Sequence, residues 1–510
     1  MHTIARVLTG KGIYLAFVAA VVAGLLLGLS ALELGPGLVL VGLAAIVALV
    51  CIAYRPELGF LALVATTGGL VGADKLPFLK VGPISLQISD ILLLYLLALT
   101  GMKLLGLPFF RAVRTPLDVP FLWFSLAILI STALALHEPS ISMNWALRRM
   151  RPLAYYLAYF PVTNLIRDKR QLGVIINGLI VLAVLASVAV LAQVIDPSLG
   201  LVRTRTAGLV TAGQDLGDVE RTYFQAERLI YLMLIVAASS LVLRGKEFRG
   251  AVMFVQVGVL AVGLFLTFQR NYWLTAAAML ALLGVLASGA ARFRVLKWAS
   301  VGLIGLATLS SLPLASTQRY LAAAQDRLFR GMRLDVLEAD KSAQWRLMEM
   351  RYAVQSIEEN PLVGIGIGNY YRPAIASESS SETDGLRYYV HNAYLWVLVD
   401  MGLVGFVPFL WLFAAAIVRG LKRWRTISDA KLRAFALGGT LGILGQAISN
   451  LVAPNFVQSW ILVAFPIVLG ANELIYGWET SERDARVAVL ASGSLVGSVE
   501  EDYGKRASLA

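Results

Sequence analysis

The fold of this 510-residue chain is decided by the stretch WRLMEMRYAVQSIEENPLVGIGIGNYY (345–371) and by VHNAYLWVLVDMGLVG (390–405), which follows it. The stretch 317–405 contains the one long polar insertion in a sequence that otherwise consists of apolar runs, and this insertion leads directly into His391, Asn392 and another apolar run. We therefore interpret the chain before this insertion as a scaffold for the groups that the insertion carries.

Apolar residues recur at helical spacing in the first segment and predict a helix that ends at Asn360-Pro361. Charged residues such as Glu349 fall off this apolar stripe, whereas Arg346 is expected at its edge, where the guanidinium can reach into a cavity. The stripe consists of Ala343, Leu347, Met350, Val354 and Ile357.

A glycine-dense turn follows the predicted helix, with Gly364, Gly366 and Gly368 at alternate positions. This spacing is not a dinucleotide-binding fingerprint, because GxGxG lacks the GxGxxG spacing and no strand precedes it. The glycines permit a tight turn whose amides can bind phosphate oxygens. Alternatively, the turn only returns the chain to the membrane.

The composition indicates a membrane protein, with 58% hydrophobic residues, 15% charged residues and a mean hydropathy of +0.73. The net charge of +12 does not indicate a nucleic-acid partner, because Lys and Arg form short clusters between apolar runs, a pattern that orients helices in a bilayer. The single cysteine, Cys51, excludes an intrachain disulfide framework and a cysteine-based metal site.

The apolar runs predict an all-α polytopic membrane protein with about 12–14 transmembrane helices and one large, partly helical loop. The first run follows a basic flank like that of a signal peptide, but it is long enough to span a bilayer, so we interpret it as a retained helix. The predicted runs are 13–32, 38–54, 58–72, 84–105, 117–136, 152–166, 171–195, 222–243, 250–268, 271–290, 298–315, 391–418, 434–453 and 456–476.

This pattern divides the chain into a transmembrane scaffold (1–315), a large outward loop with the candidate functional elements (316–390), C-terminal transmembrane helices (391–476) and a disordered cytoplasmic tail (477–510). Basic clusters in every second loop place both termini in the cytoplasm and the insertion outside. The clusters are Lys103/Arg111/Arg114, Arg167/Lys169/Arg170, Arg244/Lys246/Arg249, Arg292/Arg294/Lys297 and Arg419/Lys422/Arg423/Arg425/Lys431/Arg433.

Several arginines depart from this rule, because positive charge is normally rare in short outward loops. They either pair with nearby carboxylates and lipid phosphates or bind a substrate. For Arg270, in a two-residue turn between two runs, we favour a functional role because nothing else polar is required there. The others are Arg148, Arg149, Arg151, Arg203, Arg205 and Arg221.

His391 is a candidate general base, because it begins an apolar run with Asn392 as a plausible helix N-cap. A helix N-terminus disfavours the imidazolium, so a histidine there tends to stay neutral and able to accept a proton. Alternatively, His391 is an interfacial histidine without a catalytic role, and Tyr394 beside it belongs to an interface belt or to a sugar-stacking surface. With three histidines in the chain and no closely spaced pair, a metal site is not expected.

Together these motifs resemble the O-antigen ligase and O-antigen polymerase superfamily. The arginine-containing helix, the NPLVGIGIG turn and the HNAYL helix occur in the family's order, and TFQRNYWL (267–274) resembles its arginine hairpin, with Gln269 where a serine is usual. The resemblance implies that His391 is the essential histidine and that Arg270 and Arg346 are the arginines of the hairpin and the loop helix. Gly364, Gly366, Gly368, Asn392 and Tyr394 are expected to bind substrate.

The resemblance implies a glycosyltransferase of the bacterial inner membrane, with its active site facing the periplasm. The enzyme is expected to be metal-independent and to use no cofactor. It would move a glycan from undecaprenyl diphosphate to an acceptor sugar hydroxyl, with the membrane lipid as its surroundings. The acceptor is the lipid A core in a ligase or the end of another repeat unit in a polymerase, and the ligase is the interpretation that we favour.

A lipid-linked glycan transporter or flippase is a more distant alternative. Transporters usually carry internal repeats and interrupted helices at the membrane midplane, and we predict neither from this sequence. A transferase consumes a lipid-diphosphate glycan in purified form without ATP, which distinguishes it from a pump.

Overall fold

The computed structural model is almost entirely helical and describes residues 36–69, 78–81, 84–106, 110–139, 141–201, 203–205, 221–223, 225–244, 250–311, 318, 324–325, 341–373, 387–458 and 460–507. Two short antiparallel hairpins, β1–β2 and β3–β4, are the strands in this part of the chain. The strands are β1 (Phe78–Val81), β2 (Ile84–Gln87), β3 (Arg203–Arg205) and β4 (Arg221–Tyr223).

The described helices follow one another with short connections. The first half contains α2 (Pro36–Tyr54), α3 (Pro56–Val64), the π-helix η1 (Ala65–Gly69), α4 (Ile88–Gly106), α5 (Asp118–His137), α6 (Met143–Ala154), η3 (Tyr155–Ala158), α7 (Tyr159–Leu165), α8 (Lys169–Ile195), η4 (Pro197–Leu199) and α9 (Glu227–Leu243). The second half contains α10 (Gly250–Leu266), α11 (Arg270–Leu286), α12 (Ala290–Ser311), α15 (Lys341–Glu359), α16 (Ala393–Arg423), η9 (Trp424–Thr426), α17 (Ala430–Ser449), η10 (Trp460–Val463) and α18 (Ala464–Ala507).

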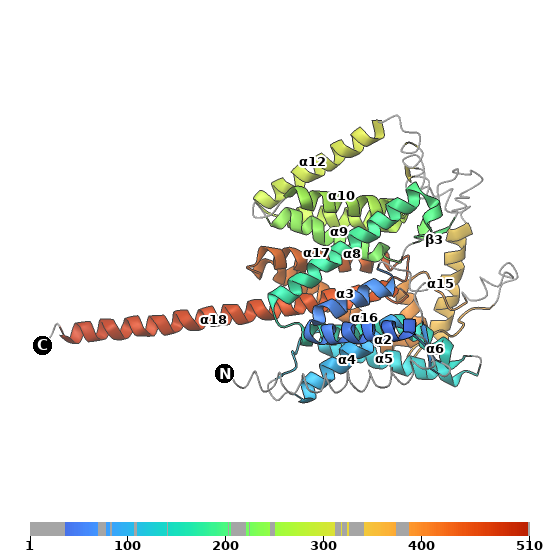
Figure 1. Cartoon of the computed structure of the whole chain (residues 1–510), viewed down its shortest axis with the longest axis horizontal. Helices are drawn as coiled ribbons and strands as arrows, with labels where there is room; N and C mark the ends of the chain where they lie inside the picture. Colours follow the sequence, from blue (N-terminus) through green and yellow to red (C-terminus); the bar gives the residue numbers. More distant parts are fainter. Residues whose placement is uncertain are drawn as a thin grey trace.

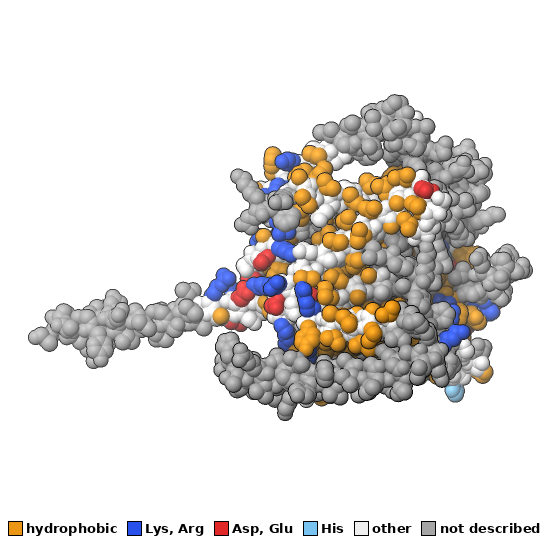
Figure 2. Space-filling model, viewed as in Figure 1, with side chains coloured by type: hydrophobic (Ala, Val, Ile, Leu, Met, Phe, Trp, Pro, Cys, Tyr) orange, Lys and Arg blue, Asp and Glu red, His pale blue; other side chains and the backbone are white. Residues whose placement is uncertain are grey.

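The long apolar helices lie side by side in a bundle, and α15 crosses one end of it (Figure 1). Within the described ranges, four helices are long and apolar enough to cross a membrane, namely α4, α5, α8 and the stretch Ala393–Thr426, and shorter apolar helices accompany them. Hydrophobic side chains cover the middle of the face seen in Figure 2, and charged ones gather where α18 leaves the bundle. The prediction of an all-α polytopic membrane protein is confirmed. The number of 12–14 crossings stays a prediction.

The centre of the bundle is the contact between α9 and α17, because glycines in α17 let the two helices approach closely. A Cβ atom at Gly438 would lie 2.6 Å from the Cα of Val236, and one at Gly442 would lie 2.4 Å from Leu232. Most of α9 is buried, from Leu229 onward. This rigid pair carries the ends of α9 and α17 to the region where α15 crosses the bundle.

The described members of the five predicted cytoplasmic basic clusters lie together at the end of the bundle opposite α15, whereas Lys246 and Arg249 lie outside the described residues. Contacts between loops that are distant in sequence establish this arrangement, and they agree with the alternation of charge along the chain. The contacts are Arg167 to the carbonyl of Arg111 (3.5 Å), Arg294 to the carbonyl of Val242 (2.6 Å), Arg425 to the carbonyl of Leu286 (3.3 Å), Arg423 to Thr480 (3.4 Å) and Lys169 to Glu482 (2.5 Å).

Each predicted apolar run from 38 onward overlaps at least one helix, whereas 13–32 lies outside the described residues. The segment 152–166 is divided among α6, η3 and α7, with Pro152 inside α6. The tail differs more, since we predict disorder there. In the structure, α18 continues as one helix through Ala507 and projects from the bundle (Figure 1). The start of this tail has partners, because Glu479 accepts hydrogen bonds from Ser428 and Glu482 pairs with Lys169.

The predicted helix 343–357 is present as α15, but the face that packs on the bundle is not the predicted one. Leu347, Met350 and Val354 of the apolar stripe are 57%, 42% and 45% exposed, whereas Glu349 and Ala353 are buried. The rotation of α15 is set by polar contacts of Glu349 that the periodicity of apolar residues does not report.

Candidate functional site

His391 and Glu349 form a close pair where α15 crosses the bundle. Nδ1 of His391 lies 2.6 Å from Oε2 of Glu349, and the backbone N–H of His391 donates to the same oxygen at 3.3 Å. The indole N–H of Trp345 donates to the other carboxylate oxygen at 2.8 Å. Because a carboxylate accepts from Nδ1–H, the lone pair of the imidazole is left on Nε2. The ring is therefore oriented to accept a proton at Nε2.

Asn392 fixes the position of His391 by capping the next helix. Its Oδ1 accepts from the backbone N–H groups of Tyr394 and Leu395 at 2.9 and 3.1 Å, which confirms the predicted N-cap of α16. The side-chain amide of Asn392 also donates to the carbonyl of Leu451 at 3.2 Å, just beyond the end of α17. The side chain of His391 stays 33% exposed, so it can meet a substrate.

Arg346 lies three residues before Glu349, on the same side of α15. Its charge acts on the hydroxyl of Tyr389, whose ring lies 4.7 Å from that of His391. Burial raises the pKa of Tyr389, Arg228 and Arg346 oppose this rise, and Glu349 adds to it, so Tyr389 stays a neutral phenol. The structure thus brings Arg346 and His391, which are distant in sequence, into the neighbourhood of one tyrosine.

Arg270 is the first residue of α11 and follows a tight turn. Phe268 has a φ of 52°, which is rare for a residue with a side chain. Gln269, where the family pattern has a serine, donates to Glu227 at 2.5 Å, and Asn271 donates to Ser449 at 2.8 Å. The arginine hairpin is therefore held on both sides, against the start of α9 and the end of α17.

The end of α17 joins the hairpin to the histidine. Asn271 contacts Ser449 there, Asn392 contacts Leu451, and the backbone N–H of Ala393 donates to the carbonyl of Asn450 at 2.9 Å. Asn271 thus attaches the arginine hairpin, and Asn392 attaches the start of α16, to the same short segment at the end of α17. The predicted site residues Arg270, Arg346 and His391 are all attached to this end of the bundle.

The glycine turn fills a break in α16. The backbone of Gly402 is not helical, with φ 58° and ψ −158°, which corrects our prediction that no helix is interrupted. The backbone N–H groups of Ile365 and Gly366 donate to the carbonyls of Val399 and Asp400 at 2.8 and 3.1 Å. On the other side of the break, the N–H groups of Leu403 and Val404 donate to the carbonyls of Pro361 and Leu362, at 2.9 and 3.0 Å.

The turn requires glycine because of its close approach to α16. Gly364 has a φ of 69°, and a Cβ there would lie 2.5 Å from the carbonyl oxygen of Val399. The backbone carbonyl and N–H groups that the break leaves without helical partners are therefore hydrogen-bonded by the glycine turn.

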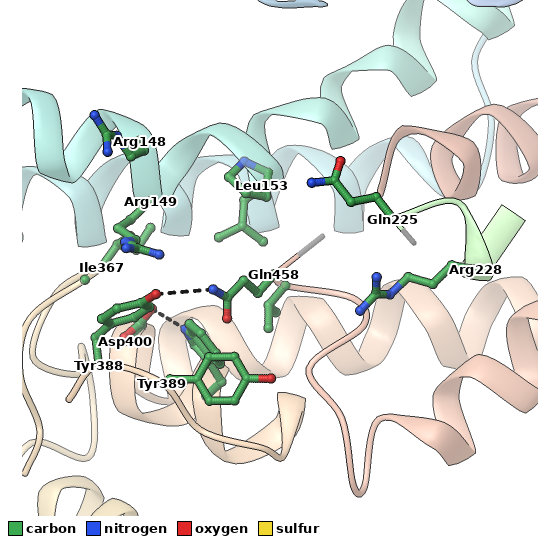
Figure 3. A pocket seen from close by; sticks show the side chains of 14 residues that line it. Arg148, Arg149, Leu153, Gln225, Arg228, Ile367, Tyr388, Tyr389, Asp400 and Gln458 are labelled. Carbon is green, nitrogen blue, oxygen red and sulfur yellow. Dashed lines mark hydrogen bonds between the residues drawn. The ribbon is translucent and has the colours of Figure 1, made fainter. Parts of the chain in front are cut away.

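A cavity of about 380 Å³ opens between α6, the start of α9, the glycine turn and α16 (Figure 3). Its wall carries the guanidinium groups of Arg148, Arg149 and Arg228, and the buried carboxylate of Asp400. Tyr389 belongs to the wall, and its ring centre lies 4.7 Å from that of His391. The lining residues are Arg148, Arg149, Pro152, Leu153, Gln225, Arg228, Ile367, Gly368, Tyr388, Tyr389, Trp396, Asp400, Val457 and Gln458.

Residues 255–410 match the family model described as O-antigen ligase. The match confirms the resemblance that the motifs carry to the O-antigen ligase superfamily. It contains the arginine hairpin, α15, the glycine turn and the first part of α16. A search of curated proteins gives no match for the chain.

The matched segment contains every predicted site residue. Several of these residues form hydrogen bonds within the protein. The amides of Gly364 and Gly366 donate to the carbonyls of Asn360 and Asp400, and the hydroxyl of Tyr394 donates to the carbonyl of Ala447 at 2.7 Å. Gly368 lies in the cavity wall. Substrate binding by the three glycines, Asn392 and Tyr394 stays a prediction.

Other groups at the site were not predicted, or were predicted without a role. Glu349 and Arg228 carried no functional signal in the sequence, and Arg148 and Arg149 were noted only as unexpected outward charges. Arg151, of the same cluster, pairs with Asp90 at 2.9 Å and is structural. Arginines at a predicted outward helix end are therefore a useful signal, but the sequence does not separate the structural arginines from those that line the cavity. The side chains of Arg203, Arg205 and Arg221 lie outside the described part of the chain.

Proposed function

We propose that this protein transfers a glycan from undecaprenyl diphosphate to a hydroxyl group of an acceptor sugar, with the lipid A core as acceptor. The match at 255–410 supports an O-antigen ligase or polymerase type of membrane glycosyltransferase. The observation that carries the finer proposal is the contact of 2.6 Å between Glu349 and Nδ1 of His391, which leaves Nε2 as a proton acceptor.

In this proposal the acceptor hydroxyl gives its proton to Nε2 of His391 while its oxygen attacks the anomeric carbon of the donor. The bond between that carbon and the diphosphate breaks, and undecaprenyl diphosphate leaves. Arg270 and Arg346 bind the diphosphate, because guanidinium groups offer bidentate hydrogen bonds to phosphate. With base and leaving group on opposite faces of the sugar, the displacement inverts the anomeric centre.

Loss of the gene product distinguishes a ligase from a polymerase. For a ligase, we expect a deletion strain to lose polymer on its lipid A core and to retain repeat polymer on undecaprenyl diphosphate. Glycan analysis of both lipid fractions measures this outcome, with a complemented strain as control. Accumulation of single repeat units instead of polymer would identify the polymerase. If the deletion strain has unchanged glycans in both lipid fractions, the proposed transferase activity is contradicted.

The proposal requires that α15 face the periplasm, as the charge pattern favours. In a Cys51→Ser background, we expect Glu358→Cys on α15 to react with an impermeant maleimide in intact spheroplasts. Lys422→Cys, exposed at the opposite end of the bundle, is expected to react only after the membrane is permeabilised. Reversed labelling of the two cysteines would contradict a periplasmic active site.

A further inference from the structure

The cavity beside Tyr389 has the size and chemistry of a small-molecule site. Its volume of about 380 Å³ falls within the range of about 300–1,000 Å³ that is typical of ligand pockets. Its wall is assembled from elements far apart in the chain, since α6 supplies Arg149, the segment before α16 supplies Tyr388, and the loop after α17 supplies Gln458 (Figure 3). Of these, only the segment before α16 lies within the matched residues 255–410.

The wall carries an excess of positive charge. It contains three arginines and one carboxylate, that of Asp400, which accepts a hydrogen bond from the indole N–H of Trp396 at 2.7 Å. Glu227 lies 3.7 Å from Arg228 behind the wall, and including it still leaves one net positive charge. Burial lowers the pKa of Arg149, with Tyr388 acting against this effect, so a bound anion would stabilise the charged guanidinium.

Two buried polar atoms in the wall have no hydrogen-bond partner among the described residues, and they have opposite requirements. Nε of Arg149 needs an acceptor, and Oε1 of Gln458 needs a donor. Buried groups of this kind are rare because a donor or acceptor that leaves water without a new partner destabilises the folded protein. A ligand that offers an anionic oxygen and a hydroxyl group satisfies both.

Aromatic rings supply the remaining surface. The guanidinium carbon of Arg149 lies 3.7 Å from the ring centre of Tyr388, which leaves the guanidinium edge for a ligand. The ring of Tyr389 lies 5.1 Å from that of Trp396, and both rings line the cavity. Such rings pack against the apolar face of a sugar while polar groups bind its oxygens.

We infer that this cavity binds an anionic sugar residue, with a carboxylate or phosphate group, that belongs to the acceptor glycan. The anion lies against Arg148 and Arg149, and a sugar hydroxyl donates to Gln458. The assignment to the acceptor rests on the proposed function, because Tyr389 forms a wall shared with His391, the base that takes the acceptor proton. The binding of an anionic sugar rests on the cavity alone.

The test measures binding of glucuronate, glucose 6-phosphate and glucose to the purified full-length protein in detergent, by saturation-transfer NMR. We expect both anionic sugars to bind at least tenfold more tightly than glucose. Arg149→Gln is expected to weaken them by about tenfold to one hundredfold, as for loss of a charged hydrogen bond. Arg351→Gln, an exposed arginine of α15 outside the cavity, is the matched control and should bind normally.

Arg149 also packs on Trp145, so Arg149→Gln can disturb the fold. Arg148→Gln and Gln458→Ala then decide the question, because Arg148 is exposed and Gln458 makes one long contact of 3.4 Å with Tyr388. Equal binding of charged and neutral sugars, or normal binding by both of these variants, overturns the inference.

Undecaprenyl diphosphate without glycan is the competitor that separates acceptor from donor. If it displaces glucuronate from wild-type protein and Arg148→Gln weakens its own binding, the cavity holds the donor diphosphate and the acceptor assignment is wrong. If the protein binds anionic sugars but transfers no glycan in any assay, the proposed function fails while the sugar site stands.

Discussion

His391→Ala is expected to lower the turnover number for glycan transfer by about 100- to 10,000-fold, which is the usual contribution of a general base. Its Nδ1 is bound to Glu349 at 2.6 Å, so in the proposed mechanism the acceptor hydroxyl gives its proton to Nε2. Removing the ring is expected to leave the arginines in place, because Asn392 still caps α16 and Glu349 keeps its bonds to Trp345 and to the backbone N–H of residue 391, which hold α15. Affinity for the lipid-diphosphate donor should therefore stay within about threefold of the wild type.

The matched variants are Arg270→Lys and Arg346→Lys, which keep the charge but lose the bidentate geometry. We expect each to weaken donor binding by about tenfold to one hundredfold. Turnover and donor affinity are measured in the same membranes for all variants, at equal protein level. The mechanism is wrong if His391→Ala turns over normally, or if it loses donor affinity as severely as the arginine variants.

Hydrophobic periodicity was sufficient to predict the bundle, because each long apolar run must bury its backbone polar groups in a helix to cross a membrane. It could not predict how α15 is rotated. There, the bonds of Glu349 to His391 and Trp345 hold the apolar stripe outward. Contacts between residues that are distant in sequence thus determine which face of α15 packs on the bundle, and the apolar pattern of a single sequence does not reveal these contacts.

The break in α16 was missed for a similar reason. Gly402 stands in an apolar run in which glycine is common, and only the docked turn, with its bonds to Val399 and Leu403, makes the break stable. The candidate site divides in the same way. Local helix-capping chemistry predicted the N-cap at Asn392 and made His391 a candidate base, and the family resemblance favoured that role over an interfacial histidine. Arg149 and Gln458 meet only because α6 and the loop after α17 converge in three dimensions.

Glu349→Gln is expected to lower turnover by about 100-fold or more, although the two side chains have nearly the same shape. The carboxylate accepts hydrogen bonds from Nδ1 and the backbone N–H of His391 through one oxygen, and from Trp345 through the other. In the variant, an amide N–H2 can donate to Nδ1, which places the imidazole proton on Nε2. The tautomer that results cannot accept a proton from the acceptor hydroxyl.

In the proposed mechanism the carboxylate also stabilises the imidazolium that forms when His391 takes the proton, and a neutral amide would not. Glu358→Gln, on the exposed side of the same helix, is the matched control and should keep normal turnover. Normal thermal unfolding and donor affinity of Glu349→Gln would show that the loss is not structural.

The decisive measurement is a double-mutant cycle. If Glu349 acts through His391, then Glu349→Gln should cause no further loss of turnover in protein that already carries His391→Ala, because residues that act as one unit are not additive. A full additional loss in that background would mean that Glu349 contributes independently of the imidazole. Glu349 would then be a binding or structural residue, and His391 would have to act as a base without a carboxylate partner.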